Sequence, residues 1–175
     1  IEAEKYLQNS IDLSKKHQYT NGLAKGLTNI SAVYNLRDET EKAIEYLRVS
    51  FALFQKVGDK VSEGISYSNT ALYFLKLNQI DSAFKYIDLS MQVNENIKNQ
   101  RNLILTLIVS ARTNLIVNDT SLFLSQMDSA YLMANRNGYK NLSLNAVNVL
   151  LDYFASIEDY ESAFRFSQIQ TKLKD

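Results

Sequence analysis

The sequence contains no cysteine, no proline and no tryptophan, and a single histidine among its 175 residues. Without cysteine, disulfides, thiolate chemistry and cysteine-ligated zinc sites are excluded. His17 has neither a cysteine nor a second histidine with which a metal site or a catalytic pair could be built. The absence of proline, together with only five glycines, predicts nearly continuous helix joined by short turns.

The chain also lacks an excess of charge and a long hydrophobic run. It carries 19 basic and 19 acidic residues, so we expect neither nucleic acid nor an anionic membrane surface as a partner. The apolar runs 103–109 and 146–151 are far shorter than the roughly 20 residues that span a bilayer. No phosphate-binding loop, G-x-G-x-x-G or G-x-S-x-G motif is present. We therefore expect no catalytic residues, no metal and no cofactor.

What the sequence does contain is an internal repeat. Alanine recurs at multiples of 40 residues, at Ala3, Ala43, Ala83 and Ala163. Phe123 occupies the same place in the remaining repeat. Apolar residues recur in the same register: Leu7, Leu47, Ile87 and Met127. A period of about 40 with helical patterning predicts stacked helix pairs, each stabilised by its neighbours.

The repeat predicts a single all-α solenoid over residues 1–175 with about nine helices. Its parts are a half repeat, 1–18, and four helix pairs, 19–58, 59–98, 99–138 and 139–175. Gly58 and Gly138 are expected to end helices, and Asp59 to cap the next one. Asp38 and Glu41 form a predicted capping box. A second small column, Ser31, Ala71 and Ala111, predicts close helix packing. Leu151 and Phe123 break the two columns in the last two units, where looser or shifted packing is expected.

These columns resemble the tetratricopeptide repeat family. The resemblance is carried along most of the chain by Leu27, Ile30, Ser31, Tyr34, Ala43, Leu47, Ser50, Tyr67, Ala71, Phe74, Ala83, Ile87, Ser90, Val147, Leu150, Phe154 and Ala163. The third pair matches least, with Asn114 where an aromatic residue is usual. The units are longer than is usual in the family and lack the usual proline, as in the variants of kinesin light chains and bacterial peptide-sensing regulators. The resemblance implies a right-handed superhelix with a concave groove, and no chemistry.

In this family the groove is lined from fixed positions of the first helix of each pair. Carried over to this chain, those positions are Lys25, Thr28, Asn29, Ala32, Ile65, Ser68, Asn69, Leu72, Leu105, Ile108, Val109, Arg112, Asn145, Asn148, Val149 and Asp152.

Asn29 and Asn69 stand one full period apart, in the same place of two successive repeats. An Asn amide both donates and accepts, so the two can pair with the backbone of an extended peptide whatever its side chains. Such a role explains Asn inside a helix despite its low helix propensity. The alternative is coincidence, because the chain contains seventeen Asn residues.

Arg112 lies in an otherwise apolar stretch and has two interpretations. It can receive a carboxylate of a ligand, or it can pair with Asp152 of the next repeat, and we favour the pairing.

The function that we expect is binding of a protein or peptide in the concave groove, without enzymatic activity. The resemblance suggests the sensor or interaction region of a bacterial signalling or regulatory protein, in the cytoplasm or the periplasm. Because the chain begins at Ile1, inside a repeat, we expect it to be a fragment. The alternative is a scaffold that forms a homodimer through exposed end residues: Leu7, Ile11, Leu13, Phe164, Phe166 and Ile169.

Overall fold

The computed structural model describes residues 2–174; Ile1, Asp175 and the side chain of Ala3 lie outside the described residues. Over that range the chain is all-α and contains the nine helices that the repeat predicts. They are α1 (Glu2–Lys16), α2 (Thr20–Leu36), α3 (Thr40–Val57), α4 (Lys60–Lys76), α5 (Ile80–Asn96), α6 (Gln100–Ile116), α7 (Thr120–Arg136), α8 (Lys140–Ser156) and α9 (Tyr160–Lys174).

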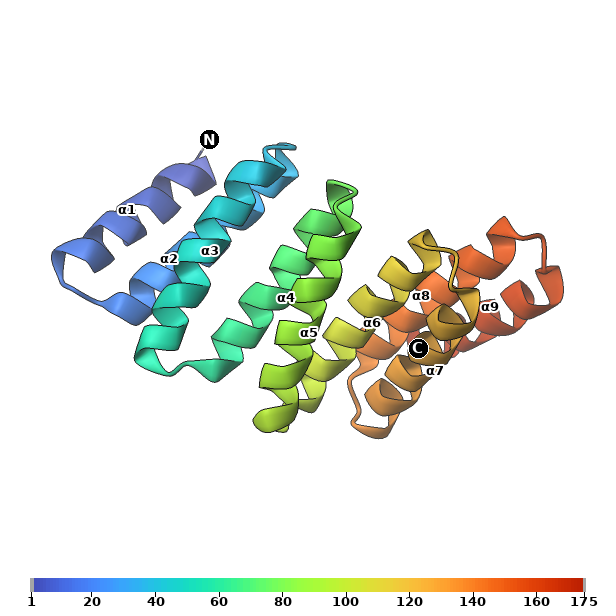
Figure 1. Cartoon of the computed structure of the whole chain (residues 1–175). Helices are drawn as coiled ribbons and strands as arrows, with labels where there is room; N and C mark the ends of the chain where they lie inside the picture. Colours follow the sequence, from blue (N-terminus) through green and yellow to red (C-terminus); the bar gives the residue numbers. More distant parts are fainter. Residues whose placement is uncertain (1, 175) are drawn as a thin grey trace. The chain divides into compact units, whose positions relative to one another are not determined.

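The helices pack as consecutive antiparallel pairs in two compact units, residues 1–99 and 100–175. In the first unit, α2 pairs with α3 and α4 with α5, while α1 packs on α2 and α3 on α4 (Figure 1). In the second unit, α6 pairs with α7 and α8 with α9, and α7 packs on α8. Each pair therefore buries its apolar face against its neighbours. A single right-handed solenoid over the whole chain stays a prediction.

The turns between the helices share one geometry, which recurs at half the period of the sequence repeat. One residue in each turn has a positive φ: Gln18, Asp38, Gly58, Asn78, Lys98, Asn118, Gly138 and Glu158. The amide of the following residue donates to a carbonyl near the end of the preceding helix, as Asp59 does to Phe54 at 3.0 Å. This is the Schellman motif, which satisfies the last carbonyls of a helix. The predicted roles of Gly58 and Gly138 are confirmed.

The same turn determines which residue can cap the next helix. Asp59 accepts a hydrogen bond from the Ser62 amide at 3.0 Å, as predicted. The predicted capping box of Asp38 and Glu41 is wrong, because Asp38 occupies the left-handed position and Glu39 the capping position. The Asp38 carboxylate instead accepts a hydrogen bond from Lys76 Nζ at 2.7 Å.

Lys98→Gly is expected to stabilise the protein by about 1 kcal/mol, because Lys98 adopts the left-handed conformation. Its φ is 54°. A Cβ in that region costs about 1–2 kcal/mol, and glycine is free of that cost. Lys85→Gly is the matched control, because an exposed glycine inside α5 should destabilise by about 1 kcal/mol. Urea unfolding followed by circular dichroism checks both. Equal destabilisation by the two substitutions would contradict the strain at Lys98.

The small columns permit close packing of the helices, as predicted. Side chains at both columns are buried: Ser31, Ala43, Ala71, Ala83, Ala111 and Ala163. The Phe123 ring is completely buried in the core of the second unit. The looser or shifted packing expected there stays a prediction. Leu151, which breaks the other column, is half-buried against the same core.

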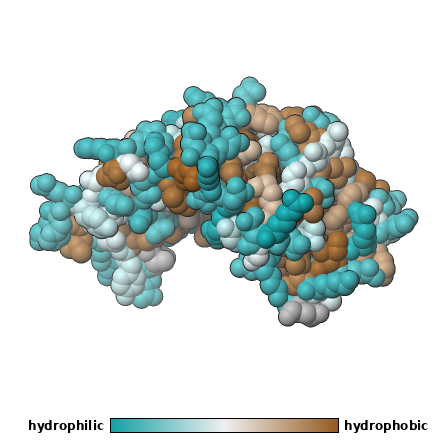
Figure 2. Space-filling model, turned by 90° about the horizontal axis from the view of Figure 1, so that it is seen from below, coloured by the Kyte–Doolittle hydropathy of each residue, from teal (hydrophilic) through white to brown (hydrophobic). Residues whose placement is uncertain are grey.

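The predicted end residues divide into buried and exposed ones. Ile11 is buried against Gly26 of α2, and the Phe166 ring stacks on Phe154 at 5.5 Å, so the prediction is wrong for Ile11 and Phe166. Leu7 and Ile169 are half-buried. Leu13 and Phe164 are 60% and 65% exposed, as predicted. Figure 2 shows that apolar side chains reach the molecular surface among polar ones. No helix between residues 2 and 174 has the length and hydrophobicity needed to cross a bilayer.

Candidate functional site

Four of the predicted groove residues line one pocket in the first unit. Lys25, Thr28 and Asn29 reach it from α2, where their helical spacing places them on one face. Ile65 and Ser62, one turn apart, reach it from α4, and Phe54 reaches it from the end of α3. The pocket has a volume of about 210 Å³.

Phe54 and Ser62 are pocket residues that the sequence did not predict. The family pattern was carried over only to fixed positions of the first helices, whereas Phe54 lies on a second helix and Ser62 one turn before Ile65. A signal was present, since Phe54 stands where the next two repeats have Asn94 and Ala134. The side chain at this place therefore differs in size from one repeat to the next, and the space that it leaves next to the first helix differs as well.

The hydroxyl of Thr28 is used within its own helix pair. It lies 2.6 Å from Ser50 Oγ, and Ser50 donates to the Ala24 carbonyl at 2.9 Å. The next pair repeats the arrangement, with Ser68 Oγ 2.8 Å from Ser90 Oγ. These bonds join the first helix of each pair to the second, so the hydroxyls serve the packing of the pair.

The remaining residues of this row behave in the same way. Asn148 Oδ1 accepts a hydrogen bond from Gln170 at 2.8 Å, and Ile108 is buried within the core of the second unit. Ser68 is buried too. The side chains of Ser68 and Ile108 therefore do not line an open groove, contrary to the prediction, because this row faces the second helix of the pair.

Asn29 and Asn69 keep their side-chain amides available. Asn29 is exposed and Asn69 half-buried, and no side-chain hydrogen bond of either occurs within the part of the chain that the structure describes. Leu72, one turn beyond Asn69 on α4, is half-buried. The amides keep both donors and acceptors for a ligand.

Lys25 is the cation of the pocket. It is exposed and forms no ion pair among the described residues. Burial opposes ionisation of the nearby Asp59, but the Ser62 amide and hydroxyl, with the charge of Lys25, hold the pKa of Asp59 below its usual value. Asp59 is thus a charged cap for α4. It accepts hydrogen bonds from Ser62 and Asn21, and the Lys25 ammonium is left for solvent or a ligand.

The second unit contains the other predicted groove residues. Arg112, Asn145 and Asp152 are exposed. Leu105 and Val149 are half-buried, and Val109 is buried. The pairing of Arg112 with Asp152 is not formed within residues 2–174. The reason is that α8 packs mainly on α7 and α9, and only marginally on α6, so neighbouring first helices stay apart.

Residues 2–174 hold no group of three His, Asp or Glu side chains placed to bind a metal ion. The one deeply buried carboxylate among them, Glu63 on α4, is satisfied within the fold. It accepts hydrogen bonds from Gln55 Nε2 at 2.9 Å, from Lys60 Nζ at 2.8 Å and from the Tyr67 hydroxyl at 3.3 Å. A carboxylate with these partners joins α3 to α4 and has a structural role.

No protein-family model matches the sequence, and no curated protein sequence matches it. Several solved structures are similar in fold. Aspartyl phosphate phosphatase F from Bacillus subtilis superposes with a TM-score of 0.77 at 11% identity, over 96% of this chain and 48% of that one. BtubC from P. vanneervenii superposes with a TM-score of 0.72 at 11% identity, over 89% of this chain and 64% of that one. A Rap protein complexed with Competence and Sporulation Factor superposes with a TM-score of 0.72 at 14% identity, over 97% of this chain and 46% of that one.

The chain spans between 46% and 64% of the length of these three structures. At 11–14% identity the likeness concerns the fold alone. This chain is therefore an all-α protein of antiparallel helix pairs, with the tetratricopeptide-like fold that these structures share.

Proposed function

We propose that this chain is a peptide-binding module of the tetratricopeptide type, without enzymatic activity. The observation that carries the proposal is the pocket between α2 and α4, where Lys25, Thr28, Asn29 and Ile65 come together. Beside it lie the amides of Asn29 and Asn69, with no partner among the described residues. An apolar floor with a few free polar groups is typical of a binding site.

The lining residues support binding rather than catalysis. Lys25 is the one ionisable side chain among the six, so no pair of acid and base groups lines the pocket. Lys25 and Asn29 offer hydrogen bonds and a positive charge, which recognise a ligand without changing it.

We further propose that the module is the sensor or interaction region of a bacterial signalling or regulatory protein. The Rap protein of similar fold was solved in complex with Competence and Sporulation Factor. That complex supports a bound regulatory factor as the class of partner for this chain.

The Asn29→Ala/Asn69→Ala double variant is expected to bind selected peptides at least about tenfold more weakly than the wild type. Each lost amide removes hydrogen bonds to a peptide backbone, and about 1.4 kcal/mol corresponds to tenfold. Peptides are first selected on the wild-type chain from a display library, and titration calorimetry then gives their affinities.

The matched control is Asn96→Ala/Asn135→Ala, which removes two exposed amides elsewhere on α5 and α7. It should leave the affinity unchanged. Equal affinity of both double variants would contradict backbone capture by Asn29 and Asn69. Selection of no peptide at all would contradict peptide binding.

The alternative function is a scaffold that self-associates through the exposed Leu13 or Phe164 side chains. The observation behind it is that these two large apolar side chains are 60% and 65% exposed. The same double variant separates the two functions, because a scaffold keeps its dimer in sedimentation experiments when Asn29 and Asn69 are replaced.

A further inference from the structure

The pocket between α2 and α4 is too small to enclose a drug-sized ligand. Binding sites for such ligands enclose roughly 300–1,000 Å³, whereas this pocket has about 210 Å³. It has the size to take one side chain of a longer ligand. The pocket is open to solvent on the side where Lys25 and Asn29, which are exposed, form its edge.

The hydroxyl groups that line the pocket are already bonded within the protein. Thr28 Oγ1 contacts Ser50 Oγ at 2.6 Å and donates to the Ala24 carbonyl at 3.2 Å. Ser62 Oγ donates to Asp59 Oδ2 at 2.9 Å. A polar ligand side chain would lose its water and find few partners there. The unbonded polar groups, those of Lys25 and Asn29, lie at the exposed edge.

The rest of the lining is hydrocarbon. The Phe54 ring is almost completely buried and forms the floor, and Ile65 of α4 is half-buried beside it. An apolar side chain that enters covers the exposed part of Ile65 and loses its own contact with water, and this removal of apolar surface from water favours binding.

The position of Asn29 connects the pocket with backbone capture. Asn29 lines the pocket itself, and Asn69 lies one turn beyond Ile65 on α4. In an extended segment, successive side chains point to opposite sides. A segment whose peptide groups bond to these amides therefore directs one side chain into the pocket.

We infer that this pocket selects a single aliphatic side chain, of about the size of leucine, as the anchor of the bound segment. Ile65 is then the residue that sets the permitted size. The inference rests on the proposed function and adds to it the chemistry that the ligand must carry.

The first test uses positional-scanning libraries of N-acetylated, C-amidated hexapeptides on the whole chain. The wild type is expected to prefer Leu, Ile, Met or Val over Ala and Ser at one position by at least about tenfold. Ile65→Ala enlarges the pocket, so the preference at that position should move to Phe or Trp. Because this is a gain of binding, a poorly folded variant cannot imitate it.

Ile157→Ala is the matched control, since Ile157 is exposed and lies after α8 in the second unit. It should keep the wild-type preference. Binding with no preference at any position, or with the same preference in Ile65→Ala, would overturn the inference and leave backbone capture standing. No hexapeptide binding to any protein would overturn the inference and the proposed function together.

A second measurement uses a single capped amino acid as the ligand in place of a peptide. N-acetyl-leucine N-methylamide, added at millimolar concentration to protein with labelled isoleucine methyl groups, should shift the Ile65 signal and leave that of Ile157 unchanged. N-acetylserine N-methylamide should shift neither. Equal shifts from both compounds, or none at Ile65, would overturn the inference.

Discussion

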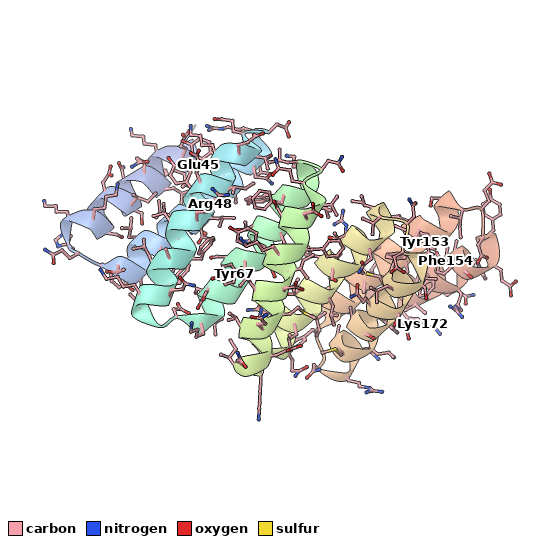
Figure 3. All side chains as sticks on the ribbon, in the orientation of Figure 1. Glu45, Arg48, Tyr67, Tyr153, Phe154 and Lys172 are labelled. Atoms are coloured by element: carbon pink, nitrogen blue, oxygen red, sulfur yellow. The ribbon has the colours of Figure 1, made fainter. Side chains whose placement is uncertain are left out.

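Replacing Phe123 with alanine is expected to lower the free energy of unfolding by about 3–5 kcal/mol. The Phe123 ring is completely buried (0% exposed) and meets the Tyr153 ring edge-on at 4.8 Å. Figure 3 labels Tyr153 beside Phe154 on α8. Truncation would leave a cavity within a packed core that can close only in part.

The repeat alone leads to the opposite expectation. Alanine occupies the same place at positions 43, 83 and 163, and a change toward the commonest residue of a repeat is usually neutral or stabilising. The structure argues otherwise, because the Phe123 ring is part of the packed core of the second unit, and the side chains around it, such as Tyr153, remain in the variant.

Urea unfolding followed by circular dichroism separates these expectations. Phe164→Ala is the matched control, a phenylalanine of the same unit that is 65% exposed and should cost no more than about 0.5 kcal/mol. Similar unfolding curves for the two variants would show that Phe123 is not an integral part of the core.

The second large effect is expected at alkaline pH and concerns Tyr67 of α4, labelled in Figure 3. Its side chain is 4% exposed, accepts a hydrogen bond from Gln55 at 2.7 Å and donates one to Glu63 at 3.3 Å. Burial first, and then the negative charge of Glu63, raise the pKa of Tyr67 to about 12.

The sign of the pH effect follows from the two pKa values of Tyr67. An unfolded tyrosine has a pKa of about 10, so between pH 10 and 12 the unfolded chain loses this proton while the folded chain keeps it. The stabilisation is complete below pH 10 and lost as the pH rises through 12. Its size is about 2–3 kcal/mol, from two pKa units.

Tyr67→Phe removes this titration and should reduce the loss of unfolding free energy between pH 9 and 12 by that amount. The variant will be less stable than the wild type at pH 9, because its hydrogen bonds to Glu63 and Gln55 are absent. Tyr160→Phe, at an exposed tyrosine, is the control that should follow the wild type. Parallel curves for Tyr67→Phe and the wild type would contradict the raised pKa.

The helices could be predicted from the sequence because their signals are local and repeated. Apolar residues at helical spacing and small residues once in each repeat are sufficient to place nine helices in antiparallel pairs over residues 2–174. The shorter period of the turns could not be seen, since only Gly58 and Gly138 carry glycine at the left-handed position. Lys98 and Glu158 adopt it because the helices on both sides fix the turn.

The candidate site was predicted in part. Lys25, Thr28, Asn29 and Ile65 meet in one pocket, as their carried-over positions suggest. Phe54 was missed because its role depends on the tertiary contact of α3 with α2 and α4, which no local pattern records. Ser68 was assigned to the groove because helical periodicity does not show that Ser90 lies opposite it.

The central claim is that ligands bind at the pocket between α2 and α4. The most direct test maps the binding site of a selected peptide by NMR. Chemical-shift changes are expected at Lys25, Asn29, Ile65 and Asn69 on addition of a hexapeptide selected on the wild-type chain. Changes confined to the exposed ends, at Leu13 or Phe164, with none on α2 and α4, would contradict the account.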